Sequence, residues 1–265
     1  MAINGKKRNV MDMNSITNDS SNPSIGEMVA EDYRKAEVFK KFGIDFCCGC
    51  KDSLNETCNR QGINVSELRQ ALEDLDNQAK ENPSQDYTSW ELDFLADYII
   101  NTHHKYVEAA LPLLDEFSTK VARVHGESHP EVIEIDSLYQ AVANELRMHM
   151  HKEENILFPY IKEMVDAKRN NISLQPSPFG TIKNPIEMME MEHESAGGNM
   201  QRIKELSQDY QPPEYACNTF RVLYAKLQEF ENDLHQHIHL ENHILFPKSI
   251  QLEAEMLNQE SAFRQ

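Results

Sequence analysis

The sequence predicts an all-α protein, in which an antiparallel, up-and-down four-helix bundle follows a small helical domain. Three observations lead to this prediction. Apolar residues recur at steps of three and four along four long stretches. Modest loops join these stretches, and no run of alternating β-branched residues is long enough for a strand. Four amphipathic helices joined in this way bury their apolar faces against one another as a bundle.

The chain divides into four parts. Residues 1–23 are polar and lack a periodic apolar pattern, so we expect a disordered tail. Residues 24–78 are expected to form the small helical domain, which begins at the capping-box pattern Ser24-Ile-Gly-Glu27 and contains three closely spaced cysteines. Residues 79–87 are expected to be a linker, and residues 88–258 the bundle. Its helices are expected over residues 88–124, 130–169, 185–207 and 212–258.

The formal net charge of −18 disfavours nucleic acid as a partner, because binding the phosphate backbone relies on clustered lysine and arginine. An acidic protein does attract cations. No apolar stretch is long enough to cross a membrane, and the N-terminus lacks the apolar run of an export signal. The odd number of cysteines, five, indicates reduced thiols. We therefore expect a cytoplasmic protein.

Two segments of the chain are nearly identical. HMHKEENILFP occupies residues 149–159, and HIHLENHILFP lies 88 positions later, at residues 237–247. Each places a histidine and a glutamate, four residues apart, in the apolar stripe of its helix. One such pair would be an ordinary solvated pair, but two buried carboxylates cost several kcal/mol unless they are compensated. No lysine or arginine is in register with both glutamates. The pattern therefore predicts metal ligands, and these are His149, Glu153, His237 and Glu241.

The other two helices also place histidines among apolar residues. His193 lies in the middle of the inward stripe of the third helix, whereas the first helix offers both His103 and His104. Periodicity does not decide between these two. The separation from His193 is 89 for His104 and 90 for His103, against 88 for the repeated motif, which leans towards His104. Four histidines and two glutamates on four antiparallel helices make a site for two metal ions, for which iron suits the ligand types.

The repeated Ile-Leu-Phe-Pro sequences follow the glutamates directly. Residues 156–158 and 244–246 are expected to form an apolar plug that limits the entry of water to the metals. Pro159 and Pro247 each remove a backbone hydrogen bond, so we expect them to kink or end their helices.

Other polar residues near the motifs have different expected roles. Glu145 and Glu192 are candidates to orient the metal ligands through hydrogen bonds, although both could equally be surface carboxylates. His235, His239 and His243 form a row at steps of four, on the side of their helix away from the leucines. We therefore expect this row to face solvent.

Together these motifs resemble the hemerythrin-like domain of the iron–sulfur cluster repair di-iron proteins. The N-terminal Phe-Gly-Ile-Asp-Phe-Cys-Cys-Gly, residues 42–49, is similar to the small domain of that family, and the resemblance spans roughly residues 24–250. It implies that the first-helix ligand is the histidine seven residues before Leu111-Pro112, which is His104. The implied ligands of two non-haem iron ions, with both glutamates bridging, are His104, His149, Glu153, His193, His237 and Glu241.

The resemblance also implies a function. Members restore iron–sulfur clusters damaged by oxidative or nitrosative stress, so the implied partners are damaged client proteins and the implied role is iron donation. Two alternatives are a nitric oxide or peroxide reductase at the same site and an oxygen- or gas-binding sensor. Oxygen carriers of this type have a further histidine one turn after the third-helix ligand, where this chain has Gly197, which disfavours oxygen storage. A homodimer is compatible with the sequence.

One departure from the family pattern concerns the cysteines. The usual Cys-Cys-Gly-Gly is replaced by Cys47-Cys48-Gly49-Cys50. The additional thiol could serve as a metal ligand or form a redox pair with Cys48. Ser53 is an expected helix start nearby, and a helix N-terminus favours thiolates.

Overall fold

The computed structural model describes residues 23–46, 52–78, 86–175 and 177–263. These residues are mainly helical, and the β pairing among them is one bridge between Ser24 and Ser53. The predicted all-α class is therefore confirmed. None of the described helices combines the length and the apolar character that a membrane span requires.

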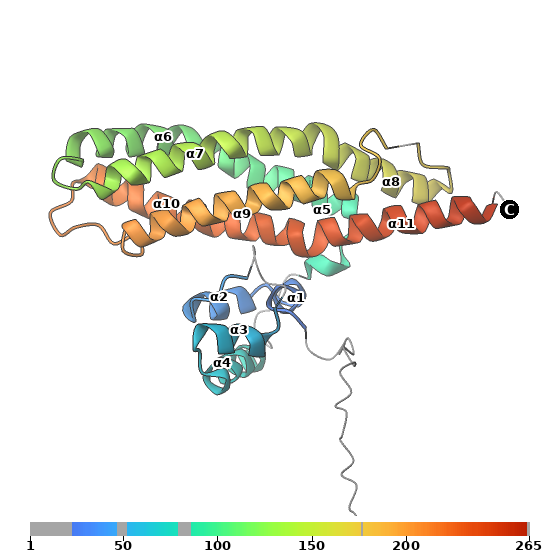
Figure 1. Cartoon of the computed structure of the whole chain (residues 1–265), viewed down its shortest axis with the longest axis horizontal. Helices are drawn as coiled ribbons and strands as arrows, with labels where there is room; N and C mark the ends of the chain where they lie inside the picture. Colours follow the sequence, from blue (N-terminus) through green and yellow to red (C-terminus); the bar gives the residue numbers. More distant parts are fainter. Residues whose placement is uncertain (1–22, 47–51, 79–85, 176, 264–265) are drawn as a thin grey trace, which may run out of the picture.

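Four short helices form the N-terminal unit below the long helices in Figure 1. Two of them begin at capping boxes, as the sequence predicts for the first. In one, Ser24 N donates to Glu27 Oε2 at 2.7 Å; in the other, Ser53 N donates to Glu56 Oε2 at 2.9 Å. The four helices are α1 (Ile25–Glu31), α2 (Lys35–Lys41), α3 (Leu54–Gln61) and α4 (Val65–Gln78).

Four long helical stretches run alternately in opposite directions and form the bundle (Figure 1). A short 3-10 helix, η1 (Tyr87–Ser89), leads into them. The first stretch is α5 (Leu92–Ile99), η2 (Ile100–His104) and α6 (Lys105–His125); the second is α7 (Glu131–Lys152), η3 (Glu153–Leu157) and α8 (Phe158–Asn170); the third is α9 (Lys183–Leu206); the fourth is α10 (Asn218–Leu240), η4 (Glu241–Leu245) and α11 (Phe246–Phe263).

The segments η2, η3 and η4 are π-helical, a feature that the sequence analysis did not predict. A π turn holds one more residue than an α turn, and such turns occur mostly at functional sites. The helices do not end at Pro159 or Pro247. The α-helix gives way to a π turn just before each proline and then resumes, with the proline in its first turn, where a missing N–H is tolerated.

The bundle core consists of two apolar clusters with a polar layer between them. One cluster includes Leu111, Leu146, Leu227 and Leu234, and it continues into the N-terminal helices through Ile25 and Phe39. The other includes Ile99, Phe158, Ile186, Ile244 and Phe246. Along every long stretch, the candidate metal ligands lie in sequence between members of these two clusters. Apolar packing on both sides therefore isolates the polar layer from water.

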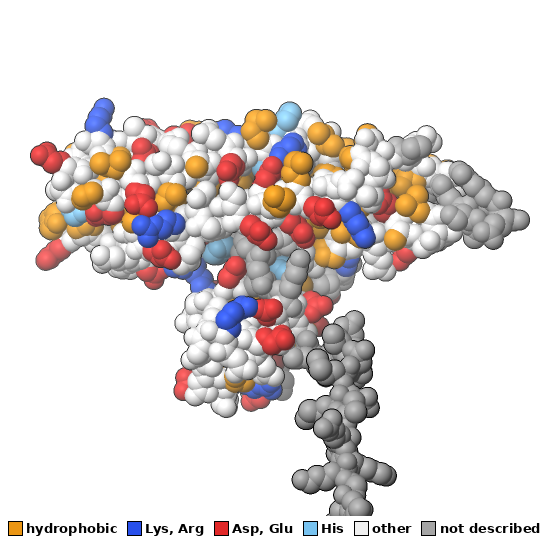
Figure 2. All heavy atoms as spheres, in the orientation of Figure 1, with side chains coloured by type: hydrophobic (Ala, Val, Ile, Leu, Met, Phe, Trp, Pro, Cys, Tyr) orange, Lys and Arg blue, Asp and Glu red, His pale blue; other side chains and the backbone are white. Residues whose placement is uncertain are grey.

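The row of histidines on the fourth stretch does not face solvent as predicted, because His239 is buried and His235 and His243 are partly buried. The N-terminal helices cover it: the Phe46 ring lies 5.8 Å from the ring of His235 and 5.9 Å from that of His239. His239 is 1% exposed, and the backbone of Gly26 lies directly against His243. Figure 2 shows histidine side chains where the N-terminal helices meet the bundle. The periodicity of one helix could not reveal that another part of the chain packs there.

Candidate metal centre

The four long stretches bring all six predicted ligands together in the polar layer of the core. All six are 0–1% exposed. They form two groups, in each of which one nitrogen or oxygen atom per residue lies within 4.8 Å of the others. The first position consists of His104, Glu153, His237 and Glu241, and the second position consists of His149, Glu153, His193 and Glu241. The two glutamates belong to both groups, which is the geometry of carboxylates that bridge two ions.

At the first position the Nε2 atoms of His104 and His237 face each other at 3.2 Å. The carboxylates lie at similar range: His104 Nε2 is 3.4 Å from Glu153 Oε2, and His237 Nε2 is 3.0 Å from Glu241 Oε1. Four donor atoms from three of the long stretches therefore converge on one small volume.

The second position has the same types of donor atom, with His149 and His193 in place of His104 and His237. The Nε2 atoms of His149 and His193 lie 3.0 Å apart. His149 Nε2 is 3.3 Å from Glu153 Oε2, and His193 Nε2 is 3.1 Å from Glu241 Oε2. Both oxygens of Glu241 are thus used, one towards each position.

Three of the four histidines are held in place through their other ring nitrogen. The Nδ1 atom of His104 lies 2.7 Å from Glu154 Oε1, that of His149 lies 2.8 Å from Glu192 Oε2, and that of His193 lies 2.8 Å from Asn242 Oδ1. These oxygens accept a hydrogen bond, so Nδ1 is the donor and Nε2 keeps its lone pair for a metal. Glu192 was a predicted candidate for this role. Glu154 and Asn242 were missed, although each directly follows a ligand glutamate in the sequence.

The fourth histidine, His237, is oriented differently. Its Nδ1 atom has no hydrogen-bond partner among the described residues. Instead its ring stacks on that of His103, with centroids 5.6 Å apart and planes 6° from parallel. His103 Nδ1 in turn lies 2.9 Å from Asp233 Oδ1. Both His103 and His104 are therefore buried, which explains why periodicity could not separate them.

The contacts in the polar layer fit bound cations. With Nδ1 donating, the Nε2 atoms of His149 and His193 face each other across 3.0 Å, an approach that a shared proton or a metal ion between them would stabilise. Both oxygens of Glu153 are buried without a hydrogen-bond partner among the described residues. Buried acceptors and charges of this kind require compensation. Imidazole and carboxylate donors would hold iron, manganese or zinc.

Comparison with known proteins identifies the fold around this layer. The profile of the hemerythrin HHE cation binding domain matches residues 95–249, more than half of the chain. The chain belongs to this family. A second profile, a domain of unknown function (DUF542), matches residues 21–76. The resemblance drawn from the sequence is therefore confirmed.

Similar proteins match nearly the whole length of the chain. The iron-sulfur cluster repair protein YtfE of Yersinia pestis (strain Pestoides F) is 35% identical over 232 residues, which cover 88% of this chain and 98% of the relative. The protein of the same name from Yersinia pseudotuberculosis serotype IB (strain PB1/+) is 34% identical over the same length. The match includes both the N-terminal helices and the hemerythrin domain.

The charges of the two shared glutamates in the hemerythrin domain depend on the surrounding imidazoles. Burial raises the pKa of Glu153 and Glu241, and in Glu153 the repulsion from Glu241 adds to this effect. The adjacent histidines outweigh both influences and hold the pKa of each carboxyl below its usual value. Both glutamates are therefore ionised at neutral pH, as bridging ligands must be.

The pKa values of the candidate ligand histidines shift in opposite directions. Burial lowers the pKa of His149, but the negative charge of Glu153, together with the hydrogen bond to Glu192, outweighs it and raises the pKa to about 10. The pKa of His104 is raised for the same reasons, whereas burial dominates at His237 and lowers its pKa. Without a metal, the carboxylates thus favour the protonated forms of His104 and His149. A bound cation would displace these protons.

Aromatic side chains close one end of the centre. Phe158 stacks on His104 with ring centroids 5.8 Å apart, and Phe246 stacks on His193 at 6.0 Å. Both phenylalanines are fully buried and belong to the predicted apolar plug. Ile156 departs from that prediction, because it is 49% exposed to solvent.

The remaining predicted residues do not reach the ligands. Glu145 is exposed and accepts a hydrogen bond from Ser195 Oγ at 3.0 Å, so it does not orient a ligand histidine. The candidate thiol site Cys47, Cys48 and Cys50 lies outside the described residues.

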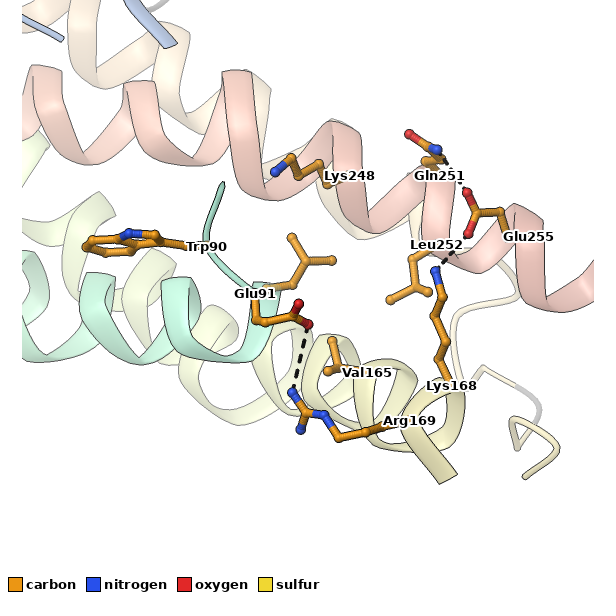
Figure 3. Close-up of a pocket in the computed structure, with 10 residues that line it drawn as sticks. Trp90, Glu91, Val165, Lys168, Arg169, Lys248, Gln251, Leu252 and Glu255 are labelled. Atoms are coloured by element: carbon orange, nitrogen blue, oxygen red, sulfur yellow. Dashed lines mark hydrogen bonds and ion pairs between the residues drawn. The ribbon is translucent and has the colours of Figure 1, made fainter. Parts of the chain in front are cut away.

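A surface pocket of about 750 Å³ lies apart from the centre, where the start of α5 faces α8 and α11 (Figure 3). Four of its charged groups form two ion pairs. Lys168 Nζ is 2.9 Å from Glu255 Oε2, and Arg169 Nη2 is 3.8 Å from Glu91 Oε2. None of its lining residues is among the six ligands. This pocket is therefore separate from the candidate metal centre.

Proposed function

We propose that this chain repairs iron–sulfur clusters damaged by oxidative or nitrosative stress, acting in the cytoplasm on damaged client proteins. The observation that carries the proposal is the sharing of Glu153 and Glu241 between two groups of ligands. The names of the similar YtfE proteins agree with it. In this proposal the ligands hold two non-haem iron ions, and iron donated from this store rebuilds the client cluster.

The residues of the chain have separate tasks in this function. Four Nε2 atoms and the two shared carboxylates bind the ions, and the carboxylates offset their positive charge. Glu154, Glu192 and Asn242 fix the orientation of three imidazoles. The apolar clusters exclude water, which keeps iron from leaving except by transfer. Ferrous iron bound here would supply both metal and reducing electrons.

The decisive experiment follows the recovery of an iron–sulfur enzyme whose cluster has been damaged by nitric oxide or peroxide. We expect the iron-loaded chain to restore activity faster than the same amount of free iron. Glu153→Leu removes a ligand from both positions while an apolar side chain suits the core, so this variant should stay folded, bind little iron and restore nothing. Recovery no faster than with free iron would rule out the proposed function.

A second candidate function, reduction of nitric oxide or peroxide, has one observation in its favour. Each position receives four donor atoms from the chain, two imidazoles and two shared carboxylates. An iron ion with six coordination positions would keep some open for a small molecule. Anaerobic incubation of the reduced iron protein with nitric oxide, with Glu153→Leu as control, tests this function directly. Consumption of nitric oxide without recovery of a client would favour the reductase over repair.

A further inference from the structure

His239 is buried at the junction between the N-terminal helices and the bundle, outside the six-ligand centre. Its ring lies 5.8 Å from that of Tyr33 and 5.9 Å from that of Phe46. Only 1% of its surface is exposed. The last turn of α10 and the N-terminal helices therefore enclose this imidazole almost completely.

Neither ring nitrogen of His239 has a hydrogen-bond partner among the described residues. A buried polar atom left unpaired costs about 1–3 kcal/mol, and native proteins retain few of them. The Phe46 ring beside it cannot pair with either nitrogen, and the Phe46 backbone lies close enough to act on one of them. The enclosure of His239 by aromatic rings thus explains its packing but leaves at least one of its two polar atoms without a role.

The nearest imidazole is that of His243, one turn further along in η4. The two ring centroids are 4.9 Å apart and the planes are inclined by 35°. Two histidines four residues apart on one helix face are a common metal-chelating pair.

We propose that His239 and His243 bind one divalent transition-metal ion, for which zinc is the probe, at a site separate from the six-ligand centre. Imidazole pairs suit zinc, copper and nickel, and the acidic chain attracts cations. Water or other side chains would fill the remaining coordination positions. His239 and His243 belong to neither of the two ligand groups.

Because His239 and His243 lie beneath the N-terminal helices, an ion bound to them would also affect how those helices are held. The backbone of α1 lies against the His243 ring, so closely that a Cβ atom on Gly26 would lie 2.1 Å from His243 Cε1. An ion bound to both imidazoles would fix the His243 ring beneath α1. Binding would thereby fasten the N-terminal helices to the bundle.

The test uses the full-length chain loaded with iron under anaerobic conditions. Zinc is added in stepwise equivalents, unbound metal is removed by gel filtration, and both metals are measured by elemental mass spectrometry. We expect one zinc to bind without loss of iron. His239→Phe and His243→Phe keep a ring in place but remove the ligand, so each should weaken zinc binding roughly tenfold or more. His151→Phe, at an exposed histidine of α7, is the matched control and should bind as the wild type does.

Two results would overturn the proposal: zinc retained equally by the phenylalanine variants and the wild type, or zinc taken up only as iron is lost. Circular dichroism checks that the variants fold. If neither variant folds, X-ray absorption at the zinc edge of the iron-loaded wild type decides, because two imidazole ligands support the proposal and none contradicts it. The iron content is measured separately, so failure of the proposed repair function leaves this test intact.

Discussion

Glu192 shows how one side chain outside the metal centre can control a ligand inside it. Its carboxylate lies 2.8 Å from His149 Nδ1 and also contacts Lys152. The hydrogen bond from His149 is the main reason why the pKa of Glu192 is lowered to about 2. The carboxylate is therefore charged at every physiological pH and keeps the His149 ring turned with Nε2 towards the second metal position.

Removing this carboxylate should weaken metal binding without removing a ligand. We expect Glu192→Ala to lower iron affinity by about 10- to 100-fold, as is usual when a partner of a metal-bound histidine is lost. Competition with a chelator measures the effect. Glu145→Ala is the matched control, since Glu145 bonds to Ser195 and does not contact a ligand histidine. Equal iron retention in the two variants would show that Glu192 does not orient His149.

At the scale of residues, the sequence pattern predicted five of the six side chains that the structure brings together, because ionisable groups inside an apolar stripe stand out, and the family resemblance added His104. It could not choose between His103 and His104 by pattern, since both are buried and both contact the His237 ring. Nor could it show that Glu154 reaches His104, because that contact joins two different helices.

At the scale of elements, the π turns explain why helical periodicity did not fully predict which face of a helix each residue lies on. His104 ends η2, Glu153 begins η3 and Glu241 begins η4, so half of the ligands lie within or at the start of a π turn. An extra residue shifts the face that the following residues present. Of the predicted plug, Phe158 and Phe246 are buried and Ile156 is exposed, although Ile244, at the same place in η4, is buried. Periodicity assumes 3.6 residues per turn and cannot detect such a shift.

The buried carboxyl of Glu231 in α10 leads to a prediction of how stability depends on pH. Glu231 is 1% exposed, and burial raises the pKa of its carboxyl despite Lys204 Nζ at 3.7 Å. The folded protein therefore holds this proton to a higher pH than the unfolded chain does. The usual pKa of a glutamate carboxyl is about 4.5, so ionisation of Glu231 lowers the free energy of unfolding as the pH rises above that value.

Glu231→Gln should accordingly be more stable than the wild type at neutral pH. The difference in the free energy of unfolding should shrink as the pH falls towards 4.5, because the wild-type carboxyl then carries its proton in both states. Urea unfolding of both proteins between pH 4.5 and 8 measures it. A difference that does not change with pH would contradict the assigned burial effect.

At the scale of the whole molecule, the junction between the N-terminal helices and the bundle is close-packed. Gly26 has no room for a side chain, because His243 occupies that space. We expect Gly26→Ala to destabilise the protein by about 1–3 kcal/mol, the usual cost of overpacking. Thermal or urea unfolding measures this cost.

Gly198→Ala is the control for that substitution. Gly198 lies in α9 with open space around its Cβ position, so alanine there should stabilise the protein by about 0.5–1 kcal/mol. Destabilisation of equal size in both variants would show that the Gly26 contact is not the cause.

Composition and capping residues predicted a separate N-terminal unit, but not the surface of the bundle on which it rests. That surface includes histidines, which occur both in cores and in solvent.

The covered histidines also have a practical consequence for handling the protein. While α1 and its neighbours stay in place, His239 cannot reach an ion fixed to a solid support, and His235 and His243 are only partly exposed. An untagged chain in the His151→Phe background should therefore bind a nickel-chelate column more weakly when closed than when the N-terminal helices lift away. Chromatographic retention would then report how often the junction opens.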